Sequence, residues 1–421
     1  MNLKTLLLTS LLPALCPMAI VSAAESPTIA ANAGNALGLE LLIKGRQPGA
    51  NALLSPYSIQ SALAMTYAGA AGDTRAEMAR VLHYPADEAA LHASFAALRT
   101  RLDEMVQAAA RRGRQADGAD EPLTLNVANR LFGQLDQEFR PAFLALTADT
   151  YGAPFQPLDF ETDSHAARKH INGWVAKQTQ DRIRELIPSP GITRDTRLVL
   201  VNAIHLKAPW ATPFEERATR PEPFYLADGE AVSVPTMKTQ GRLGHRREDG
   251  FTVVTVPYAG GGLQLLLLLP DAVDGLAKLT AKLTPEMLAE FAQAGGAEVR
   301  LQLPKFKLEP PMMPLGETLQ TLGMRTAFDK PERSANFDRM APRKPDDYLF
   351  ISEVYHQTFL DLDEKGTEAA AATAVVMMRL TSVQVDPPQP VEVRVDRPFL
   401  FAIQHRSSGA CLFLGRVVDP R

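Results

Sequence analysis

The chain has 421 residues, of which 46% are hydrophobic and 22% charged, and its formal net charge is −4. This composition is typical of a globular protein and excludes a disordered chain. The small negative charge argues against a nucleic-acid partner, and a core of this size needs neither disulfides nor metals.

The first 24 residues carry the pattern of a secretory signal peptide. Lys4 supplies the positive charge, residues 6–20 form an apolar core, and residues 21–24 resemble a cleavage site of small side chains. Two prolines interrupt the apolar run, which is shorter than the roughly 20 residues of a transmembrane helix. We therefore expect a secreted or periplasmic protein without a transmembrane segment, whose mature part is residues 25–421.

The two cysteines lie at opposite ends of the chain. Cys16 falls within the predicted signal peptide and leaves a lipid anchor open, although the bulky Leu15 before it disfavours one. Cys411 lies in an apolar run, which predicts a small buried side chain rather than a reactive thiol. A mature chain with this one cysteine has no internal disulfide.

The first half of the mature chain is predicted to combine helices with strands. Ser55 and Pro56 suit the cap and first turn of a helix. The long apolar run 197–206 is too rich in β-branched residues for an edge strand, so we expect a central strand. The remaining predicted elements are helices at 27–46, 88–112 and 164–187 and strands at 123–132 and 153–160.

The second half is predicted to be mostly strands. Gly260, Gly261 and Gly262 form a hairpin turn between two of them, and not a phosphate-binding loop, because no helix follows. No repeat or linker divides the chain, so we expect one α+β domain. The predicted elements are strands at 224–225, 232–237, 251–258, 263–269, 299–308, 351–363, 391–395, 398–403 and 412–417 and a helical segment at 276–294.

Catalytic and metal-binding motifs are missing from the sequence. It contains no nucleophile elbow, His-Glu-x-x-His, Cys-x-x-Cys or Walker loop. His165 and His170 are five residues apart, which does not place them on one face of a helix. We therefore expect neither an enzyme nor a cofactor or metal site.

A segment of small residues follows the predicted strand 351–363. Gly366 permits a sharp change of direction, and four alanines occupy 369–372. Local propensity favours a helix here, with Thr367 as its N-cap and Glu368 in its first turn. The same small side chains also suit an exposed loop, or a strand that slides between two others.

This segment resembles the hinge of the serpins, the serine protease inhibitor family. Their hinge pattern is Glu-x-Gly-Thr-Glu-Ala-Ala-x-Ala-Thr, and the chain matches it at every fixed position. The matching residues are Glu364, Lys365, Gly366, Thr367, Glu368, Ala369, Ala370, Ala371, Ala372 and Thr373. Similarity extends over nearly the whole mature chain and implies the serpin fold: α+β, with three mainly antiparallel sheets, about eight or nine helices and an exposed reactive-centre loop at about 364–390.

The resemblance implies a suicide-substrate inhibitor of serine proteases that acts as a monomer. The protease cleaves the loop and forms an acyl-enzyme, and the hinge side of the loop then inserts into the main sheet. The alternative is a binding or carrier protein of the same fold that does not inhibit. Such members usually carry charged, bulky or proline residues in the hinge, and Glu368, the one charged residue between Thr367 and Val376, belongs to the inhibitory pattern itself.

The resemblance also assigns two buried clusters beneath and beside the main sheet. The breach, where insertion begins, comprises Trp210, Lys305 and Glu364. The shutter, under the middle of the sheet, comprises Ser55, Pro56, Ser58, Asn202 and His356.

The attacked bond is expected sixteen residues after Glu364, which gives Leu380–Thr381. The register one residue earlier gives Arg379–Leu380. The first choice suits a chymotrypsin-like or elastase-like protease and the second a trypsin-like one; a cysteine protease is a further option. Residues 381–397 are longer than usual for the family and contain a proline-rich stretch, which leaves the bond open.

Overall fold

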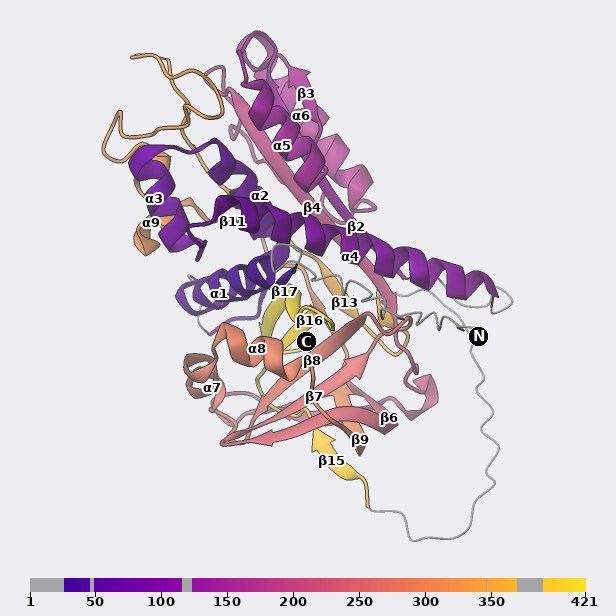
Figure 1. Ribbon diagram of the computed structural model, residues 1–421. Helices are drawn as coiled ribbons and strands as arrows, with labels where there is room; N and C mark the ends of the chain where they lie inside the picture. Colours follow the sequence, from indigo (N-terminus) through magenta and orange to yellow (C-terminus); the bar gives the residue numbers. More distant parts are fainter. Residues whose placement is uncertain (1–25, 46–48, 116–122, 346, 369–388) are drawn as a thin grey trace, which may run out of the picture.

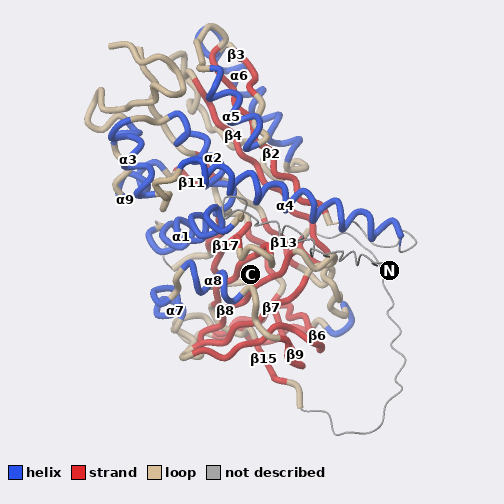
Figure 2. The backbone as a smooth tube through the Cα atoms, in the orientation of Figure 1, coloured by secondary structure: helices blue, strands red, loops and turns tan. Residues whose placement is uncertain are grey.

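Two large β-sheets organise the fold, one of six strands and one of nine. The computed structural model describes residues 26–45, 49–115, 123–345, 347–368 and 389–421. In Figure 1 the six-stranded sheet extends upward from the centre, and the nine-stranded sheet lies below it. Figure 2 shows that helices gather mainly around the upper sheet and along one side of the lower one.

The six-stranded sheet, called here the main sheet, has the order β10-β13-β14-β4-β2-β3. The predicted central strand is confirmed, because β4 lies between β14 and β2 and pairs antiparallel with β2 from Lys207 to Leu198. The strands are β2 (Thr124–Gln134), β3 (Phe155–Leu158), β4 (Leu198–Pro209), β10 (Phe306–Leu308), β13 (Leu360–Leu362) and β14 (Gly366–Thr367).

The nine-stranded sheet has the order β1-β17-β16-β8-β7-β6-β9-β15, and β5 pairs with β6. The predicted glycine hairpin joins β7 to β8, with positive φ at Gly260 and Gly261. The strands are β1 (Ala52–Leu54), β5 (Arg220–Tyr225), β6 (Ala231–Glu248), β7 (Phe251–Pro257), β8 (Leu263–Pro270), β9 (Gly296–Pro304), β15 (Val391–Arg394), β16 (Phe399–His405) and β17 (Ala410–Val417). A third sheet pairs β11 (Met313–Pro314) with β12 (Tyr355–His356).

Helices cover both faces of the main sheet. On one face, Ile171 and Val175 of α6 pack with Val201 and Ala203 of β4. On the other face lies α2, whose N-terminus is capped by the Ser55 side chain. The helices within the described ranges are α1 (Thr28–Lys44), α2 (Pro56–Gly69), α3 (Gly72–Val81), α4 (Glu88–Gln115), α5 (Pro141–Tyr151), α6 (Phe160–Gln178), α7 (Leu276–Lys282), α8 (Pro285–Phe291) and α9 (Gly316–Leu322), with 3-10 turns at Glu216–Ala218 and Thr326–Phe328.

Four predicted elements differ from the structure. The strand expected at 299–308 is divided between β9 of the nine-stranded sheet and β10 of the main sheet. The helix expected at 164–187 ends at Gln178, because the backbone turns left-handed at Gln180 and Asp181. The helical segment 276–294 is two helices, since Pro285 has no backbone N–H and starts a new helix capped by Thr284. The strand expected at 351–363 is interrupted, and strand pairing occurs only in β12 and β13.

Within the described ranges, no helix has both the length and the apolar character that crossing a bilayer requires.

Candidate functional site

The hinge begins inside the main sheet. Thr367 is paired with Leu362 of β13 on one side and with Ala208 of β4 on the other. Gly366 faces Pro209 in the same ladder. These two residues therefore form a strand and not the start of a helix, while the alanines and Thr373 lie outside the described residues.

Gly366 is required by the close approach of the backbone to β4. A Cβ atom added at this position would lie 2.1 Å from the carbonyl oxygen of Ala208. The turn before it is held by Asp363, whose carboxylate accepts hydrogen bonds from the backbone N–H groups of Lys365 at 2.8 Å and Gly366 at 3.2 Å. Only glycine fits this position without displacing the central strand.

The hinge carboxylate Glu364 is held by two side chains. One of its oxygens lies 2.7 Å from Nζ of Lys305, and the other accepts a 2.7 Å hydrogen bond from the Thr219 hydroxyl. Partial burial disfavours the charged form, but the hydrogen bonds from Lys305 and Thr219 outweigh it and lower the pKa of the Glu364 carboxyl. The carboxylate is therefore ionised at neutral pH and fixes the chain just before the turn.

Trp210 lies at the end of β4 and is bonded to the hinge turn. Its backbone N–H donates to the Lys365 carbonyl and its indole N–H to the Asp363 carbonyl, each at 2.9 Å. The indole stacks on Tyr258 with ring centroids 4.5 Å apart. The structure thus brings Trp210, Lys305 and Glu364, which the resemblance assigned to the breach, into one cluster.

The residues assigned to the shutter form a continuous chain of hydrogen bonds. Nε2 of His356 accepts from the Ser55 N–H at 3.0 Å, and the Ser55 hydroxyl accepts from the Ser58 N–H at 3.2 Å. The Ser58 hydroxyl donates to the Asn202 side chain, which in turn donates to Asn129. Pro56 follows the capping Ser55 as the first residue of α2.

Burial fixes the charge state of the shutter histidine. It lowers the pKa of His356 to about 4. The ring is therefore neutral at physiological pH, as its role as a hydrogen-bond acceptor requires.

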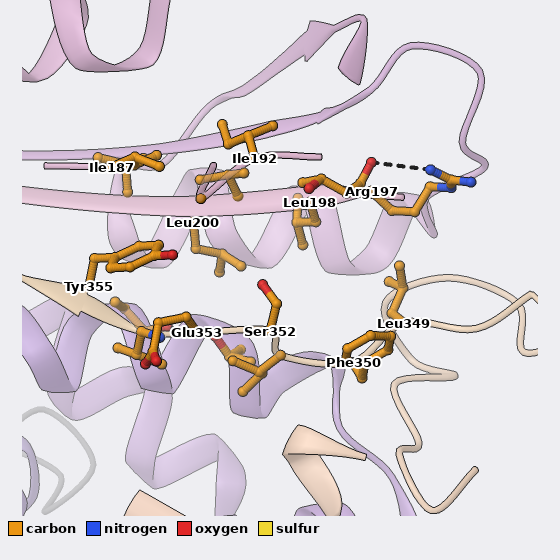
Figure 3. Close-up of a pocket in the computed structure, with 18 of the residues that line it drawn as sticks. Ile187, Ile192, Arg197, Leu198, Leu200, Leu349, Phe350, Ser352, Glu353 and Tyr355 are labelled. Atoms are coloured by element: carbon orange, nitrogen blue, oxygen red, sulfur yellow. Dashed lines mark hydrogen bonds between the residues drawn. The ribbon is translucent and has the colours of Figure 1, made fainter. Parts of the chain in front are cut away.

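A cavity of about 380 Å³ opens beside the first residues of β4, at the end of this strand away from the hinge. Figure 3 shows Ile187, Ile192, Leu198 and Leu200 on one side, with Phe350 and Tyr355 opposite them. Within the described ranges, the β-ladder on the β13 side of β4 covers only Ala208 and Pro209. Residues 198–202 of β4 line the cavity.

Some predicted site residues lie outside the described residues. They are Ala369 to Thr373 and the expected bond residues Arg379, Leu380 and Thr381.

The site also contains residues that the sequence did not predict. They lie far from the hinge in the sequence, and nothing in their neighbourhood distinguishes them from ordinary strand or loop residues. They are Tyr258, Thr219, Asn129, Arg182 and His205.

Within the described residues, the main sheet thus carries a short strand, β14, and a cavity beside the first residues of β4. The family model described as "Serpin (serine protease inhibitor)" matches residues 32–420. The chain therefore belongs to the serpin family and is a serine protease inhibitor, not an enzyme.

Individual relatives cover nearly the whole chain. The leukocyte elastase inhibitor of Bos taurus is 38% identical over 400 residues, covering 93% of this chain and 99% of the relative. Antithrombin-III of Mus musculus is 35% identical over 378 residues, covering 88% and 76%. Among solved structures, cleaved Serpin 42Da superposes with a TM-score of 0.76 at 27% identity, covering 95% of this chain and all of that one.

Proposed function

We propose that the protein traps its target by inserting the cleaved loop between β4 and β13. The observation that supports this proposal is β14, whose two residues already pair with β13 on one side and with β4 on the other. Serpin loop insertion is a known case of strand addition to a sheet. In this proposal the cavity beside Leu198 and Leu200 is the space that the new strand fills.

The register of β14 predicts where each inserted residue would lie. Because Thr367 faces Ala208 in an antiparallel pair, continuing the ladder places Thr373 opposite Asn202 and Met377 opposite Leu198. Small side chains at 369–372 would pass between α2 and α6 without displacing either helix. The inserted state gains backbone hydrogen bonds and buried surface, so the uninserted state is metastable.

We propose Leu380–Thr381 as the attacked bond, with Arg379–Leu380 as the alternative. An apolar residue before the bond suits a chymotrypsin-like or elastase-like serine protease. The name of the relative that inhibits leukocyte elastase supports this choice. Arg379 would suit a trypsin-like protease, and a cysteine protease is the least supported target.

We further propose that residues 1–24 are a signal peptide and that residues 25–421 are one domain, active as a monomer outside the cytoplasm. The support is the sequence pattern of Lys4, the apolar core and the small residues that follow. Mass spectrometry of the exported protein would test the cleavage site, and size-exclusion chromatography its monomeric state. An uncleaved N-terminus in the exported protein would contradict the first part.

The inhibitory mechanism is tested by incubating the protein with trypsin, chymotrypsin and elastase. We expect a band on denaturing electrophoresis with the combined mass of one inhibitor and one protease. Mass spectrometry of the released C-terminal peptide then identifies the attacked bond. Cleavage of the loop without a stable complex for any protease would contradict insertion as the mechanism.

A further inference from the structure

Glu368 is the residue at which the chain turns away from β14. Its N–H still donates to the Asp361 carbonyl of β13 at 2.8 Å, but its φ is +50°. A left-handed conformation is uncommon for a residue with a side chain and has a free-energy cost. Contacts of the Glu368 side chain are therefore needed to stabilise this exit from the sheet.

The Glu368 carboxylate is buried between two nitrogen donors. Its side chain is 5% exposed, and Oε2 lies 2.9 Å from Nε2 of His205 and 3.3 Å from Nε of Arg182. His205 belongs to β4 and is 3% exposed, while Arg182 follows α6 and is 48% exposed. A carboxylate this buried requires such partners, because an unpaired charge is strongly disfavoured away from water.

Arg182 is itself held in place by an aromatic ring. Its guanidinium carbon lies 4.8 Å from the centre of the Phe359 ring, just before β13. The two side-chain partners of Glu368 thus come from the segment after α6 and from β4, and Phe359, which contacts Arg182, lies at the approach to β13. These are the elements between which an inserting strand has to pass.

Other charged groups share this face of the sheet. By strand alternation, Lys207 of β4 lies on the same face as His205, and Asp361 of β13 lies on the same face as Phe359. Lys307 of β10 faces Asp361 in the ladder and lies 5.1 Å from the Phe359 ring. Asn126, opposite His205 in β2, is uncharged. Glu368 is the one carboxylate in hydrogen-bond contact with His205 within the described ranges.

We propose that His205 and Arg182 form a latch on Glu368 that slows insertion of the loop. The proposal rests on the proposed insertion mechanism. Insertion requires Glu368 to rotate from its left-handed conformation to an extended one, so its contacts with both donors must break or rearrange. Hydrogen bonds to a carboxylate are stronger than those between neutral groups, so loss of either donor should make this rearrangement easier.

The test is the rate at which the intact protein loses inhibitory activity at neutral pH and a fixed, mildly elevated temperature. Each variant's rate is divided by the wild-type rate measured in parallel. We expect His205→Ala to accelerate the loss roughly three- to tenfold, the effect on the rate of losing one hydrogen bond to a carboxylate. Arg182→Ala should accelerate the loss as well.

A matched control lies on the same segment as Arg182. Arg184 follows Arg182 by two residues, is 77% exposed and pairs with Asp181, so Arg184→Ala should leave the rate unchanged. Glu368→Gln removes the charge from the hinge side and should also accelerate the loss of activity, which guards against misfolding of one variant.

A wild-type rate for His205→Ala or for Arg182→Ala would overturn the latch. So would a slower loss of activity in either variant. Formation of a covalent complex by the wild-type protein with a protease is measured separately. Absence of that complex would contradict the proposed function, whereas a normal complex together with wild-type rates in the variants contradicts only the latch.

Discussion

The hydroxyl oxygen of Thr367 lies 2.6 Å from the hydroxyl oxygen of Tyr258, and both side chains are buried. Burial raises the pKa of the Tyr258 hydroxyl, so it stays protonated and available for this hydrogen bond. Tyr258 in turn stacks on Trp210. The first inward-facing side chain of the hinge is therefore anchored to the end of the central strand before any cleavage occurs.

This site predicts the effect of a large charged side chain at 367. Thr367→Arg would have to bury an unpaired guanidinium, so we expect loss of the covalent complex while cleavage by the protease continues. Thr367→Val is the matched control: it keeps the shape, loses about 1 kcal/mol with the hydrogen bond, and should still inhibit. The yield of complex on a denaturing gel decides, and a wild-type yield for Thr367→Arg would rule out insertion at this point.

Cleavage of the loop should stabilise the protein. A nick normally loosens a fold, but under the proposed mechanism it releases a strand that can pair with β4 beside the cavity at residues 198–202. A gain of 1 kcal/mol in the free energy of unfolding raises the melting temperature of a domain of 150–250 residues by roughly 2–4 °C. We expect a considerably larger rise after cleavage. Calorimetry before and after limited proteolysis between Met377 and Thr381 measures it. An unchanged or lower melting temperature would favour a binding protein that does not insert.

Loss of the shutter asparagine should destabilise the protein and open the main sheet. Asn202→Ala leaves the Ser58 hydroxyl and the Asn129 side chain without their partner, at a cost of about 1–3 kcal/mol. The opened sheet should accept the loop of another molecule, so we expect polymers on native gels after mild heating. Asn126→Ala, an exposed asparagine on β2, is the control. A variant that stays monomeric with a wild-type midpoint would refute this role.

Stability should fall in mild acid because of the buried histidine of the shutter. The pKa of His356 is lowered to about 4 by burial, whereas an unfolded histidine titrates near 6.5. Between these values the native state binds fewer protons, so the free energy of unfolding falls as the pH drops, by about 3 kcal/mol in full.

Chemical denaturation at several pH values measures this dependence. His356→Gln keeps an acceptor for the Ser55 N–H and should flatten the curve between pH 6.5 and 4. The contributions of His92, His245 and His405 should remain, because burial lowers their pKa values too. An unaltered slope in His356→Gln would show that this histidine is not the titrating group.

The sequence correctly predicted those features that depend on residues close together in the chain. The apolar run of β4, the capped start of α2 and the glycine hairpin between β7 and β8 all depend on local patterns. The hinge was ambiguous, because its alanines favour a helix in isolation. Thr367 belongs to a strand because it pairs with Ala208, which is distant in the sequence, and with Leu362, which lies across the preceding turn.

The partners of the hinge could not be predicted for the same reason. Tyr258 is an ordinary strand-end tyrosine in the sequence, and only the fold brings it to Thr367. Arg182 lies in a stretch that was predicted to be helical. It reaches Glu368 because the chain leaves the helix at Thr179 and turns through two left-handed residues.

The last prediction concerns the attacked bond. Arg379 and Leu380 are adjacent, so a shift of one residue changes the class of protease that is trapped. Arginine fits a pocket with a buried carboxylate, and leucine fits an apolar slot. Arg379→Ala should abolish inhibition of trypsin-like targets and spare chymotrypsin-like ones if Arg379–Leu380 is used. Leu380→Ala should do the reverse if Leu380–Thr381 is used. Second-order inhibition rates measure both, and normal rates for both variants against both classes would place the bond at 382–385 instead.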